Sequence, residues 1–286
     1  MRIPFLLILT LLIYSKLKAQ SFAPEDKNFY RVSRQTMEKA NVLKLTVTFI
    51  SSDKRSKQDS MVSTIGYYDS IGRIVLLRTN PLGNEYRQEF FYQNDLLTRI
   101  INTDFRTSAK IIHDIEYDAS LNPVTEKLYT VDSPHLVTYY YTYNNNNQLL
   151  KITQEINNKA TSFSRNYFYQ NNKLIRMEEY EKDKIFYSLL FEYGENSNTR
   201  TMYYQIRRLK KKIKMEDCIF NNKGQLIEKE TFTVEADFHD GRSLIYNQKP
   251  FSEYIFYNEN NTISHRKTIY QGKEASLSLY QYFSNY

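Results

Sequence analysis

One inserted stretch of the sequence concentrates side chains that could bind a cation. Glu235, Asp237, His239 and Asp240 bring three carboxylates and one imidazole within six residues. Oxygen and nitrogen ligands of this kind can hold a divalent ion. Acidic residues and an Asp-Gly pair are also ordinary turn chemistry. We favour a loop without metal, but keep these four residues as the leading candidates for binding.

A basic run is the second candidate for binding. It comprises Arg207, Arg208, Lys210, Lys211, Lys212 and Lys214. Such a cluster could attract an anionic polysaccharide or lipid headgroups. Lysines on a strand also prevent edge-to-edge aggregation, which is the interpretation that we favour.

Other reactive side chains predict structure rather than catalysis. The sequence contains no G-x-S-x-G, H-E-x-x-H, P-loop or G-x-G-x-x-G motif. Cys218 is the single cysteine and is expected to be a buried thiol. His113 alternates with apolar residues, which predicts a hydrogen-bonded histidine and not a ligand. Carboxylates that alternate with lysine, as in Glu228-Lys229-Glu230, indicate cross-strand pairs on a solvated face.

A repeat organises the chain that must position these residues. An aromatic residue, a polar turn and an apolar pair recur at intervals of 24 to 27 residues, with one interval of 37. The anchor aromatics are Tyr68, Tyr92, Tyr117, Tyr143, Tyr169, Tyr193, Phe220 and Tyr257, with Tyr282 in a truncated copy. This regularity predicts a repeat protein.

Each repeat predicts two strands and two tight turns. The flanks alternate with the two-residue period of a strand, and short turns join only antiparallel neighbours. Gly72, Asn147, Gly224 and Asn261, four residues after their anchors, are expected at positive φ. The fold predicted is all-β, an antiparallel meander of roughly 16–18 strands curled into a shell or barrel-like superhelix. An open, strongly twisted sheet is the alternative.

The beginning of the sequence predicts export. An apolar run follows Arg2 and ends in a polar segment, as in a secretory signal, and it is too short for a stable membrane span. We expect a signal peptide over 1–19, a segment without the repeat over 20–40, and a repeat domain over 41–286 with an insertion near 234–250. Loss of the signal reduces the net charge from +7 to +4, which argues against nucleic acid as a partner.

One repeat carries a recognisable family pattern. The segment from Tyr68 to Tyr92 reads YDSIGRIVLLRTNPLGNEYRQEFFY and resembles the YD repeat of the RHS family. A looser likeness covers residues 41 to 286, and the composition resembles secreted repeat proteins of Bacteroidetes. The resemblance implies strands that spiral into a shell, export, and in some members carbohydrate binding. The chain is too short to enclose a separate domain, so toxin delivery is not implied.

These patterns together predict an exported, non-enzymatic protein that acts as a scaffold or binding module, for a glycan or another surface protein. The location expected is the periplasm, the outer surface or the medium, and no cofactor or metal is expected. Two alternatives remain open at this stage. One is a carbohydrate-active enzyme, and the other is a repeat component of a surface or toxin complex.

Overall fold

The computed structural model describes residues 42–51, 60–80, 85–131, 136–195, 198–206, 212–232, 234–239, 242–247, 251–270 and 273–283. The expected signal peptide 1–19 and the segment 20–40 lie outside these ranges, as do the candidate residues Arg207, Arg208, Lys210, Lys211 and Asp240. In the described ranges the regular secondary structure consists of strands.

Within these ranges, twenty strands follow one another. They are β1 (Lys44–Ser51), β2 (Ser60–Tyr68), β3 (Ile74–Thr79), β4 (Tyr86–Gln93), β5 (Leu96–Asp104), β6 (Ala109–Tyr117), β7 (Pro123–Thr130), β8 (Leu136–Tyr143), β9 (Leu149–Ile156), β10 (Lys159–Gln170), β11 (Lys173–Glu181), β12 (Lys184–Tyr193), β13 (Thr199–Ile206), β14 (Lys212–Phe220), β15 (Leu226–Thr231), β16 (Val234–His239), β17 (Arg242–Asn247), β18 (Phe251–Tyr257), β19 (Ile263–Tyr270) and β20 (Lys273–Phe283).

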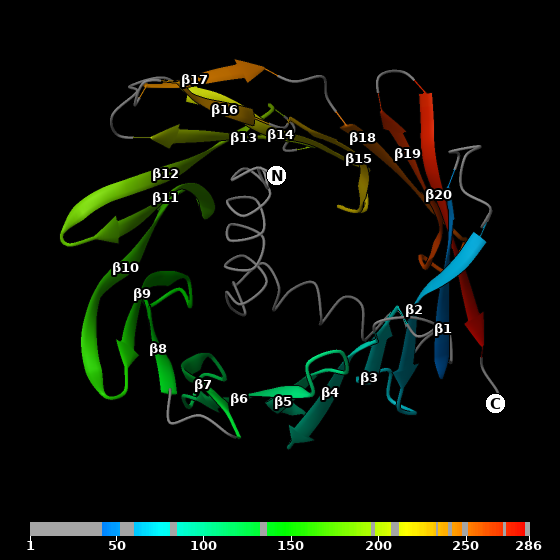
Figure 1. Ribbon diagram of the computed structural model, residues 1–286, viewed down its shortest axis with the longest axis horizontal. Helices are drawn as coiled ribbons and strands as arrows, with labels where there is room; N and C mark the ends of the chain where they lie inside the picture. The colour runs from blue at the N-terminus through cyan, green and yellow to red at the C-terminus, as the bar shows by residue number, and fades with distance from the viewer. Residues whose placement is uncertain are drawn as a thin grey trace.

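Eighteen of these strands form a single antiparallel sheet that closes on itself (Figure 1). Neighbours along the chain pair with each other, β15 pairs with β18, and β1 pairs with both β2 and β20. The closed meander confirms the predicted fold class, and the open sheet is wrong. Closure gives every strand two hydrogen-bonded neighbours, whereas an open sheet leaves two edges with unpaired backbone groups.

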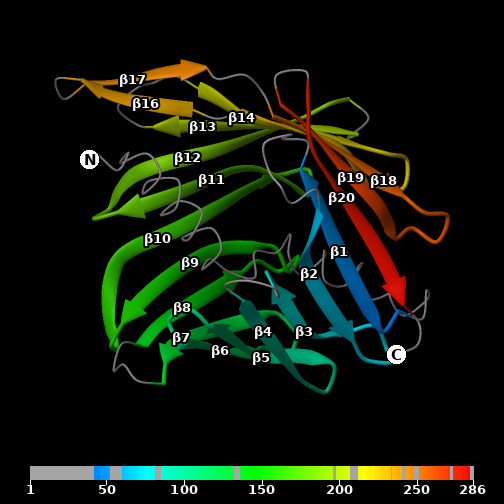
Figure 2. The same ribbon diagram turned by 45° about the vertical axis from the view of Figure 1, so that its right-hand side comes forward.

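The long interval between two anchors contains a separate hairpin. Strands β16 and β17 form a two-stranded sheet of their own between β15 and β18 (Figure 2). The barrel strands on either side pair directly with each other, with Glu230 opposite Ser252. The sheet therefore continues past the insertion without a gap.

Four of the described anchor turns share one pattern of hydrogen bonds. In the turn after Phe220, Asn221 Oδ1 accepts hydrogen bonds from the backbone N–H groups of Lys223 and Gln225, at 2.9 and 3.0 Å. The N–H of Gly224 donates to the carbonyl oxygen of Asn221 at 2.9 Å. The same pattern recurs at Asp69, Asp118 and Asn144. An Asp or Asn side chain thus holds the turn that its own backbone begins.

The predicted positive φ values are confirmed. They are 74° at Gly72, 57° at Asn147, 74° at Gly224 and 66° at Asn261. Pairs of residues at positive φ form two-residue turns after the anchors Tyr92 and Tyr169, at Asn94-Asp95 and Asn171-Asn172, and also between β9 and β10, at Asn157-Asn158. Asparagine tolerates this region better than most residues with a side chain, which explains how so many turns form with only seven glycines.

The anchor tyrosines connect successive repeats. In five repeats the anchor hydroxyl donates a hydrogen bond, 2.7 to 3.0 Å long, to a backbone carbonyl of the repeat before it. The pairs are Tyr92 to Ile74, Tyr117 to Leu97, Tyr193 to Leu174, Tyr257 to Leu226 and Tyr282 to Ile263. Each of these five anchors therefore satisfies a backbone carbonyl group of the hairpin before its own.

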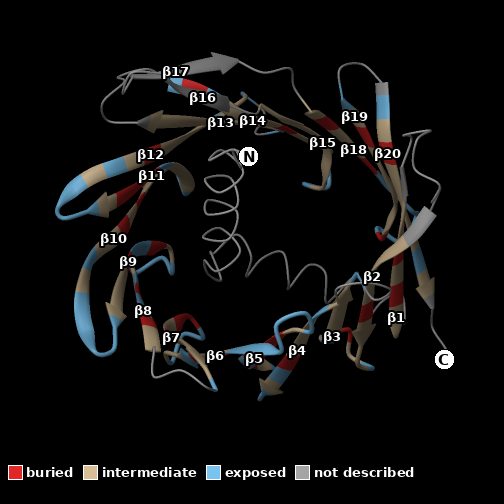
Figure 3. Cartoon of the chain, in the orientation of Figure 1, coloured by how far each residue is buried: buried red, intermediate tan, exposed pale blue. Residues whose placement is uncertain are grey.

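The two faces of the barrel differ in burial. Tyr141 is 5% exposed and its neighbour Tyr140 is 39% exposed, although both lie on β8. Side chains converge on the concave face of a barrel and diverge on the convex face, so the buried face is the inner one. Buried positions occur on strands around the barrel (Figure 3).

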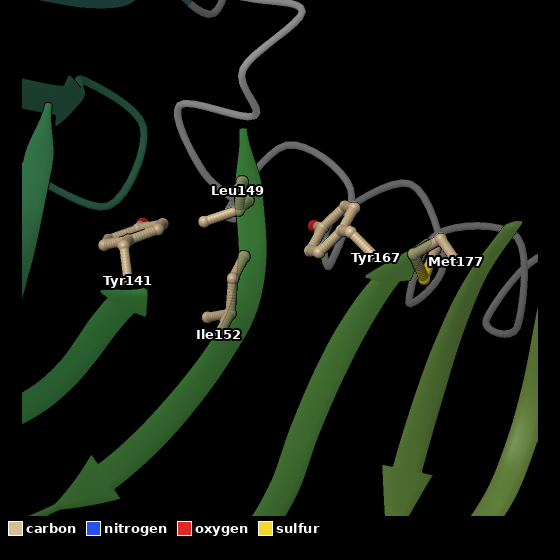
Figure 4. Packing of buried hydrophobic residues seen from close by; sticks show 5 residues of the cluster. All are labelled: Tyr141, Leu149, Ile152, Tyr167 and Met177. Atoms are coloured by element: carbon tan, nitrogen blue, oxygen red, sulfur yellow. The ribbon is translucent and has the colours of Figure 1, made fainter. Parts of the chain in front are cut away.

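The inner face carries two apolar clusters. Figure 4 shows the first, whose buried members come from four consecutive strands, β8 to β11; they are Tyr141, Leu149, Ile152, Tyr167 and Met177. The second joins β4, β5 and β6 through Phe90, Leu97, Ile100 and Ile115. Both clusters combine residues that are far apart in the sequence and adjacent in the sheet.

We predict that Gly224→Val destabilises the barrel by about 1 kcal/mol or more, because a β-branched residue is strained at this positive φ. A Cβ added at Gly224 would meet no atom within 4 Å, so the cost comes from the backbone and not from a clash. Urea unfolding of the purified protein measures the change. Gly224→Asn is the matched control and should cost less, because Asn147 and Asn261 hold the same conformation. Equal stability of the valine and asparagine variants would contradict the prediction.

Candidate functional site

The structure places the predicted acidic cluster on the inserted hairpin. Glu235, Asp237 and His239 occupy alternate positions of β16, opposite Tyr246, Leu244 and Arg242 of β17. Asp240 follows β16 and lies outside the described residues. In the part of the chain that is described, no group of three or more His, Cys, Asp or Glu side chains is placed to hold a metal ion.

The described part of the basic run lies on β14. Lys212 Nζ is 3.1 Å from Glu192 Oε1, and Lys214 pairs with Asp217. These cross-strand and local ion pairs support the interpretation that the two lysines stabilise the sheet surface. The other four candidates of this run, 207, 208, 210 and 211, lie in the connection between β13 and β14, outside the described residues.

A chain of hydrogen bonds across β4 to β8 is the first polar feature of the inner face. Gln88 Nε2 donates to Asn102 Oδ1 at 2.9 Å, and Asn102 Nδ2 lies 2.9 Å from His113 Nε2. His113 Nδ1 is 2.8 Å from Glu126 Oε1, and the Tyr141 hydroxyl donates to Glu126 Oε2 at 2.5 Å. The prediction of a hydrogen-bonded histidine is confirmed.

His113 connects the amide part of this chain to its carboxylate. Its Nε2 faces the Asn102 amide and its Nδ1 faces Glu126, so both ring nitrogens have polar partners. Burial, followed by the charge of Glu126, raises the pKa of Tyr141 well above its ordinary value. Tyr141 thus remains a hydrogen-bond donor over the whole physiological range.

A buried ion pair continues the polar layer on β10 and β11. Arg165 Nη2 is 2.5 Å from Glu179 Oε2, and both side chains are more than nine-tenths buried. The Tyr187 hydroxyl donates to the same carboxylate oxygen at 3.0 Å. Burial of two charges is costly, and the ion pair together with the Tyr187 hydroxyl offsets part of that cost.

A third polar group surrounds Glu216 on β14. Lys229 Nζ lies 2.5 Å from Glu216 Oε2, and Arg200 Nη2 lies 3.3 Å from Oε1. Burial alone would raise the pKa of Glu216, but Lys229, the Cys218 thiol and Arg200 together outweigh burial and hold this pKa below its ordinary value. Burial alone would lower the pKa of Lys229, but nearby acidic groups, Glu216 first among them, outweigh burial and raise this pKa above its ordinary value.

These shifts define the pH range over which the pair stabilises the fold. The carboxylate contributes stability above its ordinary pKa of 4.5, and the contribution is lost as the pH falls through the depressed value. The ammonium contributes below its ordinary pKa of 10.5, and the contribution is lost as the pH rises through the raised value. The pair therefore contributes fully between those two ordinary values.

The lone cysteine belongs to the same group. Cys218 is 2% exposed, which confirms the prediction of a buried thiol. Its Sγ donates to Glu216 Oε1 at 3.2 Å. Burial and the negative charge of Glu216 raise the pKa of Cys218 to about 11, so the thiol is neutral at physiological pH and a weak nucleophile.

The sequence predicted that Lys229 forms a cross-strand ion pair on a solvated face, and the inner polar groups correct this prediction. Arg99 and Asp114 form the predicted kind of pair on the outer face, with Nε and Oδ1 2.6 Å apart. Lys229 does not form a pair of this kind, because its partner Glu216 is on the inner face and its side chain is only 12% exposed. Alternation locates both residues on one face of their strands but does not say which face is concave. The signal available in the sequence was a polar side chain within an otherwise apolar alternating row, as at His113.

A cavity of about 670 Å³ opens beside Arg200, near the anchor turns that follow β12 and β14. Its lining includes Tyr193, Asn198, Arg200, Phe220 and Gly224. The volume is within the range of small-molecule sites. One guanidinium, aromatic rings and amide groups can together bind a polar ligand that carries a negative charge.

Comparisons with known proteins identify no family. No protein-family model and no curated protein matches the sequence. Among solved structures, a porin-like protein from Bacteroides uniformis ATCC 8492 is 9% identical over 85% of this chain and 98% of that chain, with a TM-score of 0.44. A porin-like protein from Bacteroides vulgatus ATCC 8482 is 8% identical over the same shares, with a TM-score of 0.31.

A third solved structure, the Photorhabdus luminescens Tc holotoxin pore, is 11% identical with a TM-score of 0.34; the match covers 80% of this chain and 14% of that one. These three likenesses are too remote to carry an argument about function, and membership of the YD-repeat family stays a prediction. Among the described residues, no helix has the length and apolar character needed to cross a membrane.

We predict that Tyr141→Phe destabilises the protein by about 1–3 kcal/mol, because it removes a donor from the buried carboxylate of Glu126. Tyr140→Phe is the matched control on the same strand. Its hydroxyl donates to Glu155 in an exposed pair, and its loss should cost no more than about 0.5 kcal/mol. Thermal or urea unfolding measures both variants, and equal losses would contradict the structural role of Glu126.

We predict that Glu216→Gln makes the Cys218 thiol more acidic, because the substitution removes the negative charge beside the sulfur. The rate of alkylation by iodoacetamide, measured against pH, reports the titration at a single site, since the chain has one cysteine. The midpoint should lie near 11 in the unmodified protein and below it in the variant. Glu192→Gln, at an exposed pair with Lys212, is the control and should leave the midpoint unchanged.

Proposed function

We propose that this chain is an exported, non-enzymatic β-repeat barrel that acts as a binding module, with a glycan as its ligand. The repeat unit, the apolar run within the expected signal peptide over 1–19 and the resemblance to YD repeats support export to the envelope or the medium. The proposed arrangement is a signal peptide over 1–19, a segment over 20–40 and the repeat domain over 41–286 with its inserted hairpin.

The composition of the inner face is the observation that carries this proposal. Tyrosine and phenylalanine side chains of many strands lie on it, including Tyr139, Phe163, Tyr187 and Phe191 around the first apolar cluster. Aromatic rings present a flat apolar surface to the C–H face of a sugar, and a tyrosine hydroxyl can bond its hydroxyl groups. Strands hold these rings rigidly, which reduces the entropy lost on binding.

The state of the buried carboxylates supports binding over hydrolysis. A glycosidase needs a pair of carboxyl groups, one of which remains protonated near neutral pH. Glu216 has a lowered pKa, and Glu179 is bound to Arg165. Glu126 accepts hydrogen bonds through both oxygens. These acids are occupied in holding strands together.

The inserted hairpin is the second place where a ligand could bind. A hairpin that projects from a rigid barrel resembles the loops on which binding residues are commonly carried. Its predicted residues Glu235, Asp237, His239 and Asp240, with Arg207, Arg208, Lys210 and Lys211 in the connection after β13, remain the proposed contacts outside the inner face.

A glycan array with the secreted protein and with a variant lacking the hairpin tests this proposal. Deleting residues 234–247 and joining the ends with a short glycine-serine linker should leave the barrel folded, because β15 and β18 already pair. We expect the unmodified protein to bind glycans and to release no reducing sugar. Weaker binding by the variant would assign the contact to the hairpin, and an unchanged profile would assign it to the inner face. Absence of binding to every glycan, or release of reducing sugar, would overturn the proposal.

A further inference from the structure

One strand position departs from the repeat. In seven hairpins, an apolar residue lies directly opposite the anchor aromatic across the strand pair. These residues are Ile74, Leu97, Pro123, Leu149, Leu174, Leu226 and Ile263. In the hairpin of β12 and β13, Arg200 lies opposite the anchor Tyr193 instead. The same seven hairpins have a bulge beside the anchor, and the pairing of β12 with β13 is regular.

The next anchor departs from the repeat as well. The other eight anchors are tyrosines, but β14 ends in Phe220. A tyrosine there could donate to the carbonyl oxygen of residue 200, by analogy with Tyr193, which donates to Leu174, and Tyr257, which donates to Leu226. Phenylalanine has no hydroxyl for this bond. Both departures thus occur at one place, on the paired strands β13 and β14.

The cavity of about 670 Å³ lies at this place. Arg200 and Phe220 both line it, together with Tyr193, Asn198, Asn222 and Gly224. The space extends to Gly224, where an added Cβ would meet no atom within 4 Å. Where the other repeats put an apolar side chain and a tyrosine hydroxyl, this one has a guanidinium, a phenyl ring and an open cavity.

Arg200 lies beside two aromatic rings and a carboxylate that it shares with a lysine. The Arg200 guanidinium lies 5.9 Å from the ring centres of both Phe191 and Phe220. Its carboxylate partner Glu216 is shared with Lys229, which is nearer. Among the described residues, Arg200 and Lys229 thus lie at one carboxylate, and the thiol of Cys218 is neutral. An anionic ligand that enters the cavity meets the guanidinium of Arg200, which lines it.

We propose that this cavity binds the carboxylate-bearing sugar unit of an acidic polysaccharide. Arg200 binds the carboxylate, the Phe220 ring packs against the C–H face of the sugar, and the amides of Asn198 and Asn222 bond its hydroxyl groups. This assignment rests on the proposed function and specifies its ligand. A neutral sugar offers no carboxylate to the Arg200 guanidinium, so the site discriminates between acidic and neutral glycans.

Calorimetric titration of the full chain tests the site with three defined probes. Two of them carry carboxylates, a galacturonic acid tetrasaccharide and a hyaluronan tetrasaccharide, and a galactose tetrasaccharide is neutral. Arg200→Leu introduces an apolar side chain like those opposite most other anchors, and Phe220→Tyr introduces the hydroxyl of the other anchors. Both variants bring the site closer to the common repeat, so the barrel should fold. Arg99→Gln removes one positive charge from the outer face and is the control for charge alone.

We expect at least one acidic probe to bind at least about tenfold more tightly than the neutral probe, and Arg200→Leu to remove that preference. Phe220→Tyr should also weaken binding of the acidic probe, because the hydroxyl enters the cavity, while Arg99→Gln should have no effect. Binding of neither acidic probe, or unchanged affinity in Arg200→Leu, would overturn this site. If the array still shows binding to other glycans, the proposed function stands without it; if no glycan binds, both fail.

Discussion

Closure of the sheet through β1 is the constraint on which the rest of the structure depends. β1 pairs with β2 on one side and with β20 on the other, so the first and last described strands meet. Strand direction alternates in an antiparallel meander. Such a sheet can close with every pair antiparallel only if the number of strands is even, and the barrel has eighteen. Closure satisfies the backbone groups of both edges and creates the two unequal faces on which burial and binding depend.

Asparagine and aspartate make such a long meander possible. Their side chains bond to the backbone of the turn, as Asn221 and Asp118 do, and they tolerate positive φ where a glycine would otherwise be needed. The anchor hydroxyls then connect one hairpin with the next. Register is thus determined locally at each turn and repeated around the barrel, which limits errors in a sheet whose strands would otherwise look alike.

The inner face combines this repeated framework with charges that are specific to each strand. Glu126, Glu179 and Glu216 are each held by partners from neighbouring strands, so their burial is offset by hydrogen bonds and ion pairs. Because every such group requires a particular partner at a particular register, the polar layer favours one alignment of the strands. At Arg200 and Phe220 the framework changes, and a cavity takes the place of packing. The proposed site therefore lies where the repeat changes, whereas the same positions of the other repeats stabilise the sheet.

The sequence by itself determined the structural repeat of this protein, which is two strands and two tight turns. Alternating side chains, anchor aromatics and turn residues predicted an antiparallel meander of roughly 16–18 strands and the positive φ at Gly72, Asn147, Gly224 and Asn261. All of these depend on residues close together in the chain. Only the tertiary structure decided that the sheet closes, which face is concave, and that Glu216 faces inward with Lys229. It also placed Arg200 beside Phe220 across two paired strands. These relations join residues separated by a dozen or more positions, and their partners are determined by register and curvature, which local periodicity does not contain.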